Sequence, residues 1–248
     1  MKDITNIKSQ KNALTAGLLY LVIIVVGMYA FVYALPQIKV DGDISKTVDN
    51  IKNNPLLFRI GIISILIMNV TSILLALYLY KLLSNINKSM AMGMLTLLLV
   101  GAGISLLNEV NHFAVIIINN MENYTLIEKQ NFTHLFVEMQ KHGSYIAVIF
   151  WGLWLFPLGC LIFSLKTRIS KFIGVMLIVA GIGYVLDSFF LFAYPEIKIP
   201  SISDYTFIGE FLLTIWLLVK SGAIEKLALS RRQINNNIYE KYAKINLG

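Results

Sequence analysis

The chain has 248 residues, of which 57% are hydrophobic and only 14% are charged. Soluble globular proteins carry about a quarter charged residues, so the composition excludes that class. The formal net charge is +7, and the single cysteine excludes an internal disulfide framework and any metal site built from several cysteines.

Six apolar segments are long enough to cross a bilayer as helices. A hydrocarbon core of about 30 Å requires roughly 20 helical residues, and lipid cannot satisfy free backbone groups. The segments are 13–35, 56–80, 89–118, 143–165, 172–194 and 201–220. We therefore expect an all-α polytopic membrane protein: a six-helix transmembrane domain over 1–222, followed by a basic amphipathic cytoplasmic tail over 223–248.

Local signals predict where these helices begin, bend and end. The first span is expected to stop at Pro36, and Pro55 suits the first turn of the second span. Pro157 lies inside the fourth span and predicts a kink, because proline removes one helical hydrogen bond. Ser201 and Asp204 have the spacing of a capping box at the start of the sixth span.

Two connections, 36–55 and 119–142, are long enough to contain a helix each. Asp43 is a suitable N-cap for the first of these helices. Both connections carry apolar residues at helical spacing, which are Ile44, Val48 and Ile51 in the first, and Phe132, Leu135, Phe136 and Met139 in the second. We expect these helices to lie flat on the outer membrane surface, either as connectors or as a cover over a site.

The distribution of cations predicts the orientation in the membrane. Fourteen of the 21 Lys and Arg residues lie in the two terminal tails, at the end of the sixth span (Lys220) and in the turns at 81–90 and 166–171. Eight of the 14 acidic residues lie on the opposite side, in the connections and at the start of the sixth span (Asp204). Cytoplasmic segments carry the excess of Lys and Arg. Both termini are therefore expected inside. The basic balance then reflects topology and attraction to anionic lipid, and nucleic-acid binding is not expected.

Five ionisable side chains lie within the expected spans: Arg59, Glu109, His112, Asp187 and Glu210. Such groups are costly in lipid, so they usually face the interior of the bundle. Counting about 1.5 Å of rise per residue places all five in the outer half of the membrane. We therefore expect four helices to contribute to one outward-facing polar layer.

Helical spacing adds polar and small neighbours to this layer. Tyr184 lies three residues before Asp187 on the fifth span. Gly181 and Gly183 on the same span would allow another helix to approach closely. One stripe of the third span holds Gly101, Ser105, Asn108, Glu109 and His112, and should face protein or water.

The charges of the layer suggest ligand or proton binding. Three carboxyl groups share it with Arg59 and with the conditional cation His112, so a protonated carboxyl, a charged histidine, a bound cation or access to outside water is needed for balance. Asp187 and Glu210 are the expected acceptors, Arg59 is their counter-ion, and Glu109 with His112 forms a second rim. A purely structural network of ion pairs and hydrogen bonds is the alternative.

Metal and catalytic interpretations find less support. Glu109 and His112 form one E-x-x-H motif, whereas a carboxylate-bridged di-iron centre uses two, and neither H-E-x-x-H nor G-x-S-x-G is present. No catalytic residue, metal ligand or cofactor is assigned.

Several segments together resemble a mainly bacterial family of six-span membrane proteins, the domain of unknown function 4386, over about residues 13–222. They are residues 16–21 (Ala-Gly-Leu-Leu-Tyr-Leu), 57–59 (Leu-Phe-Arg), 150–159 (Phe-Trp-Gly-Leu-Trp-Leu-Phe-Pro-Leu-Gly), 181–188 (Gly-Ile-Gly-Tyr-Val-Leu-Asp-Ser), 208–210 (Ile-Gly-Glu) and 216–220 (Trp-Leu-Leu-Val-Lys). The resemblance implies a multi-pass protein of the bacterial cytoplasmic membrane and brings no established activity. The third span, with Glu109 and His112, departs from the family pattern.

The leading functional hypothesis is a non-enzymatic membrane protein that binds or conducts a small solute, cation or proton through the polar layer. A structural or partner-binding scaffold is a second hypothesis, and an intramembrane lipid-modifying enzyme is a third. The expected partners are membrane lipids and a small solute or cation, and a homo-oligomer is left open.

Overall fold

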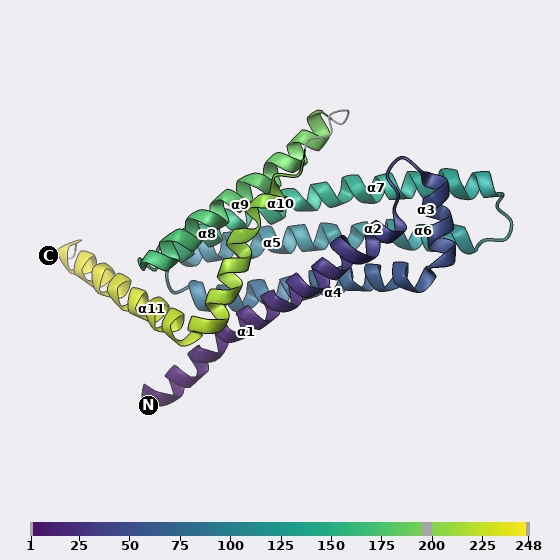
Figure 1. Cartoon of the computed structure of the whole chain (residues 1–248). Coiled ribbons are helices and arrows are strands. Elements are labelled where there is room, and N and C mark those ends of the chain that lie inside the picture. Colours follow the sequence, from purple (N-terminus) through teal and green to yellow (C-terminus); the bar gives the residue numbers. More distant parts are fainter. Residues whose placement is uncertain (1, 195–199, 247–248) are drawn as a thin grey trace.

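The computed structural model describes residues 2–194 and 200–246, and every regular element in these ranges is a helix. The start of α1 and the end of α11 lie at one end of the molecule, and α3 lies at the opposite end (Figure 1). The long axes of α4, α5 and α7 run between these two ends (Figure 1). This arrangement agrees with the all-α fold expected from the apolar segments.

The first long helix continues past its expected end. α1 (Lys2–Met28) passes through a π-helical segment, η1 (Tyr29–Ala34), into α2 (Leu35–Ile38). The expected stop at Pro36 is wrong, because this proline falls in the first turn of α2. A missing N–H costs little at that position.

The helices α3 (Ile44–Asn53) and α4 (Pro55–Leu83) begin as the sequence predicts. The side chain of Asp43 accepts a hydrogen bond from the N–H of Lys46 and caps α3. Pro55 occupies the first position of α4. Val48 and Ile51 of α3 are buried, and α3 packs against α4 and α7. Its apolar face is therefore covered by protein.

The third expected span consists of two helices, α5 (Lys88–Asn108) and α6 (Val110–Asn120), which meet at Glu109. The stripe expected to face protein does so: Gly101, Ser105, Glu109 and His112 are buried and Asn108 is partly buried.

The helix α7 (Leu126–Leu153) corrects the expectation for 119–142. A capping box between Thr125 and Glu128 starts it, and it then runs without interruption into the fourth expected span. No separate surface helix forms, because nothing in this stretch breaks the helix before Trp154. The helix is interrupted at Trp154, ahead of α8 (Leu155–Phe163), and the predicted bend at this point stays a prediction. Pro157 lacks the N–H that would bond to the carbonyl of Leu153.

The last three helices are α9 (Arg168–Ala193), α10 (Ser203–Thr206) and α11 (Ile208–Asn246). Lys220 has non-helical backbone angles (φ −120°, ψ 22°), so α11 is kinked there. Figure 1 shows the segment after the kink turning away from the bundle. The side chains of 231–248 lie outside the described residues, so the amphipathic tail stays a prediction.

Five helical segments in the described part of the chain are long and apolar enough to cross a membrane. They are Asn12–Ile38, Pro55–Leu83, Lys88–Asn120, Leu126–Phe163 and Arg168–Ala193. The sixth expected span, 201–220, corresponds to α10 and the beginning of α11 and is not among these five.

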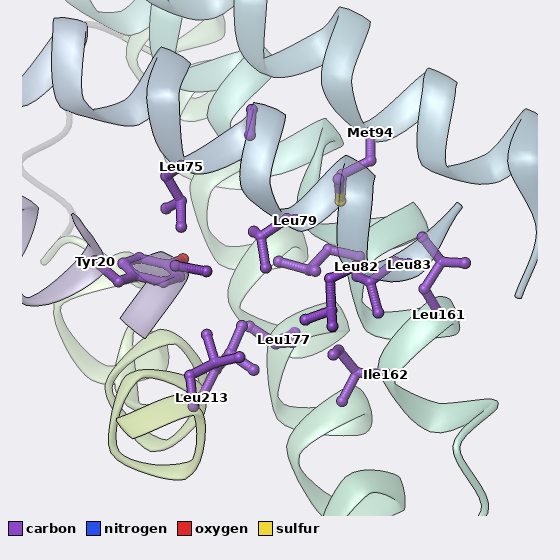
Figure 2. Packing of buried hydrophobic residues seen from close by; sticks show 14 of the residues in the cluster. Tyr20, Leu75, Leu79, Leu82, Leu83, Met94, Leu161, Ile162, Leu177 and Leu213 are labelled. Carbon is purple, nitrogen blue, oxygen red and sulfur yellow. The ribbon is translucent and has the colours of Figure 1, made fainter. Parts of the chain in front are cut away.

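The buried apolar side chains form two clusters. The larger joins α1, α4, α5, α8, α9 and α11. Figure 2 shows part of it, with Tyr20 of α1, Leu79 of α4, Leu161 of α8, Leu177 of α9 and Leu213 of α11 gathered together. The smaller joins the end of the first span to α3, α4 and α6, with Phe58 and Ile62 among its fully buried members.

Candidate functional site

The carboxylate of Glu210, near the start of α11, joins three helices. Tyr20 of α1 donates a hydrogen bond from its hydroxyl to Oε1, and Tyr184 of α9 donates one to Oε2, each 2.8 Å long. The Tyr20 side chain is only 3% exposed. Glu210 therefore connects the first and fifth spans to α11.

Asp187, near the end of α9, caps the segment that leads into α10. Its carboxylate accepts hydrogen bonds from the N–H of Ile202 at 2.7 Å, the N–H of Ser203 at 2.8 Å and the hydroxyl of Ser201 at 2.8 Å. Ser201 donates its hydroxyl to Asp187 in this cap, and the capping box expected from Ser201 and Asp204 stays a prediction. The side chain of Asp204 lies outside the described residues.

Glu109 and His112 form a buried pair at the junction of α5 and α6. The distance from His112 Nδ1 to Glu109 Oε2 is 2.7 Å, and the exposed fractions of the two residues are 0% and 1%. The ring of Phe58 meets the imidazole edge-on, with centroids 5.5 Å apart and an angle of 88°. His112 Nε2 is buried and has no hydrogen-bond partner among the described residues.

A second polar contact lies further along the same stripe. Asn69 of α4 donates hydrogen bonds to Ser105 Oγ at 3.0 Å and to the carbonyl of Ile65 at 2.9 Å. Its Oδ1 is buried without a described partner. Ser105 precedes Glu109 by one helical turn, so the polar stripe of α5 faces α4 at Ser105.

Lys39 and Gln140 belong to a polar network that sequence reasoning missed. Lys39 Nζ donates to Gln140 Oε1 at 3.0 Å, and Gln140 Nε2 donates to Ser144 Oγ at 3.0 Å. Asn108 Nδ2 donates to the carbonyl of Gln140 at 2.7 Å. Burial lowers the pKa of Lys39 to about 8, against the opposing effects of Glu109, Glu138 and Asp41. Lys39 and Gln140 are 101 residues apart, so periodicity along one helix could not indicate this contact.

Arg59 lies in a cavity of about 900 Å³, here called the Arg59 cavity, which is lined by residues of α3, α4, α6, α7 and the connection between α6 and α7. Its charged lining residues are Asp49, Lys52, Arg59, Glu122 and Lys129. The Arg59 side chain is exposed and forms no ion pair with any described carboxylate. The cavity also has an apolar wall that includes Phe58 and Ile116. A polar solute with an apolar part would fit this lining.

The expected polar layer is thus divided into separate groups. The structure brings Tyr184 to Glu210 and His112 to Glu109. It joins Asp187 to the segment before α10, and it does not pair Arg59 with Asp187 or Glu210. The role of these residues in ligand or proton binding stays a prediction. Within the described ranges, no three His, Cys, Asp or Glu side chains are grouped closely enough to hold a metal ion.

The family described as a domain of unknown function, DUF4386, matches residues 15–221. The chain belongs to this family. An uncharacterized protein of Archaeoglobus fulgidus is 31% identical over 81 residues, which cover 33% of this chain and 48% of that protein. The matched part thus spans about half the length of this curated relative. No solved structure matches the chain.

Three of the segments that carry the resemblance to DUF4386 proteins meet at Glu210. Tyr20 lies in 16–21, Tyr184 in 181–188, and Glu210 itself in 208–210. The Glu109–His112 pair lies outside the segments that carry the resemblance, although it falls within the matched range. In this DUF4386 member, the hydrogen bonds of Glu210 therefore connect three of the family-like segments.

Proposed function

We propose that this protein is a multi-pass protein of the bacterial cytoplasmic membrane, with both termini inside, and that it binds a small solute in the Arg59 cavity from the outer side. Five apolar helices support the membrane location, and α10 with the first part of α11 completes a sixth span in this proposal. The excess of Lys and Arg in the terminal tails and in two of the turns supports the orientation.

The observation that carries the solute-binding proposal is the guanidinium of Arg59, which forms no ion pair with any described residue and lies in a cavity of about 900 Å³. Three cations face two carboxylates among its lining residues, and apolar side chains form part of the wall. A guanidinium presents several N–H donors in a planar fork that matches carboxylate and phosphate groups. The proposed solute is therefore a small amphiphile with one anionic group.

Binding of short-chain probes to the protein in lipid nanodiscs tests this proposal. Hexanoate and hexyl phosphate carry the expected chemistry, hexylammonium has the opposite charge, and empty nanodiscs measure partition into lipid. We expect Arg59→Gln to weaken binding of the anionic probes roughly tenfold, which corresponds to about 1.4 kcal/mol. Arg168→Gln is the matched control, because Arg168 is also exposed but lies outside the cavity.

Equal affinities of the wild-type protein and Arg59→Gln for both anionic probes would contradict the proposal. Preferential binding of hexylammonium would also contradict it, because that result would assign the cavity to cations.

A scaffold role is the second candidate, and a different observation favours it. Both carboxylate oxygens of Glu210 accept hydrogen bonds from the protein, and so do both oxygens of Asp187. Groups occupied in this way fix helices against one another. A scaffold predicts loss of stability in variants of these residues and no saturable binding of the hexyl probes.

A further inference from the structure

The chemistry of the Glu109–His112 pair follows from its 2.7 Å contact. An ionised carboxylate only accepts hydrogen bonds, so His112 Nδ1 must carry the hydrogen when Glu109 is charged. Nε2 then holds a free lone pair, and it is buried without a described partner. In this state the pair carries one net negative charge inside the protein.

One added proton removes that net charge. The product is an imidazolium beside a carboxylate, or a neutral imidazole beside a carboxylic acid, and the two forms contain the same number of protons. A buried net charge is costly, whereas a compensated pair is less so. The pair as a unit is therefore built to bind one proton.

The charged groups around the Glu109–His112 pair come from several elements. Glu109 and Lys39 are the charged groups that act on His112. Lys39, in turn, interacts with Glu109, with Asp41 and with Glu138 of α7. From α4, Phe58 contacts the imidazole, while the next residue, Arg59, is exposed in the cavity. Lys39 is thus the described cation that acts on the pair, and Glu109, Asp41 and Glu138 are the acidic groups that act on Lys39.

Phe58 lies between the pair and the Arg59 cavity. Its ring contacts the imidazole of His112, and the same residue lines the cavity although it is only 1% exposed. Ile116, one turn beyond His112 on α6, lines the cavity as well. A change in the side-chain rotamer of Phe58 is therefore the local movement that would open the imidazole of His112 to the cavity.

We propose that Glu109 and His112 form a buried site that binds one proton, and that the proton arrives from the Arg59 cavity past the ring of Phe58. The proton binds at Nε2 of His112. Glu109 accepts the hydrogen bond from Nδ1–H and stabilises the imidazolium that forms. This inference does not depend on binding of a solute in the cavity.

Nitrogen NMR of the protein with ¹⁵N-labelled histidine in nanodiscs tests the site. The chain has three histidines, and the exposed His134 and His142 serve as internal controls. At pH 9 we expect His112 to show a hydrogen on Nδ1 and none on Nε2, with Nε2 gaining a hydrogen as the pH falls to 4. Glu109→Gln should lower the midpoint of this change by at least about one pH unit, because the variant loses the charge that favours the imidazolium.

Two results would overturn the inference of a proton site: an Nε2 that stays unprotonated down to pH 4 in the wild-type protein, or a midpoint that Glu109→Gln leaves unchanged. The first result needs no variant, so a failure of Glu109→Gln to fold would not prevent the test.

The route is tested by carbethoxylation of histidines with diethyl pyrocarbonate. Phe58→Ala should raise the reaction rate of His112 at least tenfold and leave the rates of His134 and His142 unchanged. Phe113→Ala is the matched control, because Phe113 is an exposed aromatic residue that directly follows His112. An unchanged rate for His112 in Phe58→Ala would overturn the proposed route, even if solute binding in the cavity were established.

Discussion

Gly152 of α7 and Gly181 of α9 lie backbone against backbone. A Cβ atom on Gly152 would lie 2.8 Å from the carbonyl oxygen of Gly181, and a Cβ atom on Gly181 would lie 2.7 Å from the carbonyl oxygen of Gly152. Gly159 and Gly174 repeat this reciprocal contact on α8 and α9. Close approach of small residues drives helix packing in lipid, where hydrophobic association is weak. The close approach predicted for Gly181 is thereby confirmed.

Replacing Gly181 by alanine should destabilise the protein by about 1–3 kcal/mol, because the added methyl group forces the two backbones apart. The measurement is the free energy of unfolding in denaturant. Gly103→Ala is the control, since a Cβ atom there meets nothing within 4 Å. That variant should be neutral or slightly stabilising, because alanine favours helix. Equal effects of the two substitutions would contradict the packing argument.

The hydrogen bonds to Glu210 should couple three helices energetically. Removal of either hydroxyl, by Tyr20→Phe or Tyr184→Phe, is expected to cost about 1–3 kcal/mol of stability. A double-mutant cycle of Tyr20→Phe with Glu210→Gln should give a clear interaction energy. Tyr205→Phe, at a residue that is 72% exposed, is the control. Strictly additive effects of the paired variants would show that the contact contributes nothing.

Asp187 should protect the backbone at the start of α10. In Asp187→Ala the N–H groups of Ile202 and Ser203 lose their acceptor. We expect faster hydrogen exchange at these two amides and a loss of about 1–2 kcal/mol, which is typical for removal of a helix cap. Asp49→Ala, at an exposed position, is the control. Unchanged exchange at 202 and 203 would contradict the capping role.

The pH dependence of stability should reveal the lowered pKa of Lys39, a residue that lies directly after the first apolar span. Burial lowers its pKa from 10.5 to about 8, so the folded protein releases this proton at a lower pH than the unfolded chain does. The unfolded state then binds more protons between pH 8 and about 10, and the contribution of Lys39 to stability rises with pH in that window.

The corresponding measurement compares the thermal midpoint of the wild-type protein with that of Lys39→Met from pH 7 to 10. The wild-type midpoint should rise relative to the variant above pH 8 and run parallel to it below. A constant difference across the whole range would contradict the lowered pKa of Lys39.

Much of the fold follows from local features of the sequence. Long apolar runs predicted the helices, Asp43 predicted the start of α3, and the interruption before α8 lies close to Pro157. Glu109 and His112 lie three residues apart on one stripe, so their proximity was also readable from spacing. These features depend on hydrogen bonds and contacts within one helix or its first turn.

The interhelical contacts could not be predicted in the same way. Tyr184 was expected beside Asp187 because both lie on one helix, yet its hydroxyl donates to Glu210 of α11. Tyr20 gives no signal of a place in the polar layer, because its own span contains no Asp, Glu, Lys, Arg or His. Arg59 was expected to balance distant carboxylates, and it lies instead in a cavity formed with α3, α6 and α7. Periodicity assigns a residue to a face, but only packing decides which helix that face meets.

The central claim is that the Arg59 cavity opens to the outer side of the membrane. Asn120, an exposed residue of that cavity, and Lys88, an exposed residue at the start of α5, supply the test when each is replaced by cysteine in a Cys160→Ser background. A membrane-impermeant maleimide should label Asn120→Cys in intact cells. It should label Lys88→Cys only after the cells are permeabilised. Labelling of Lys88→Cys in intact cells, with Asn120→Cys protected until the membrane is opened, would contradict the account.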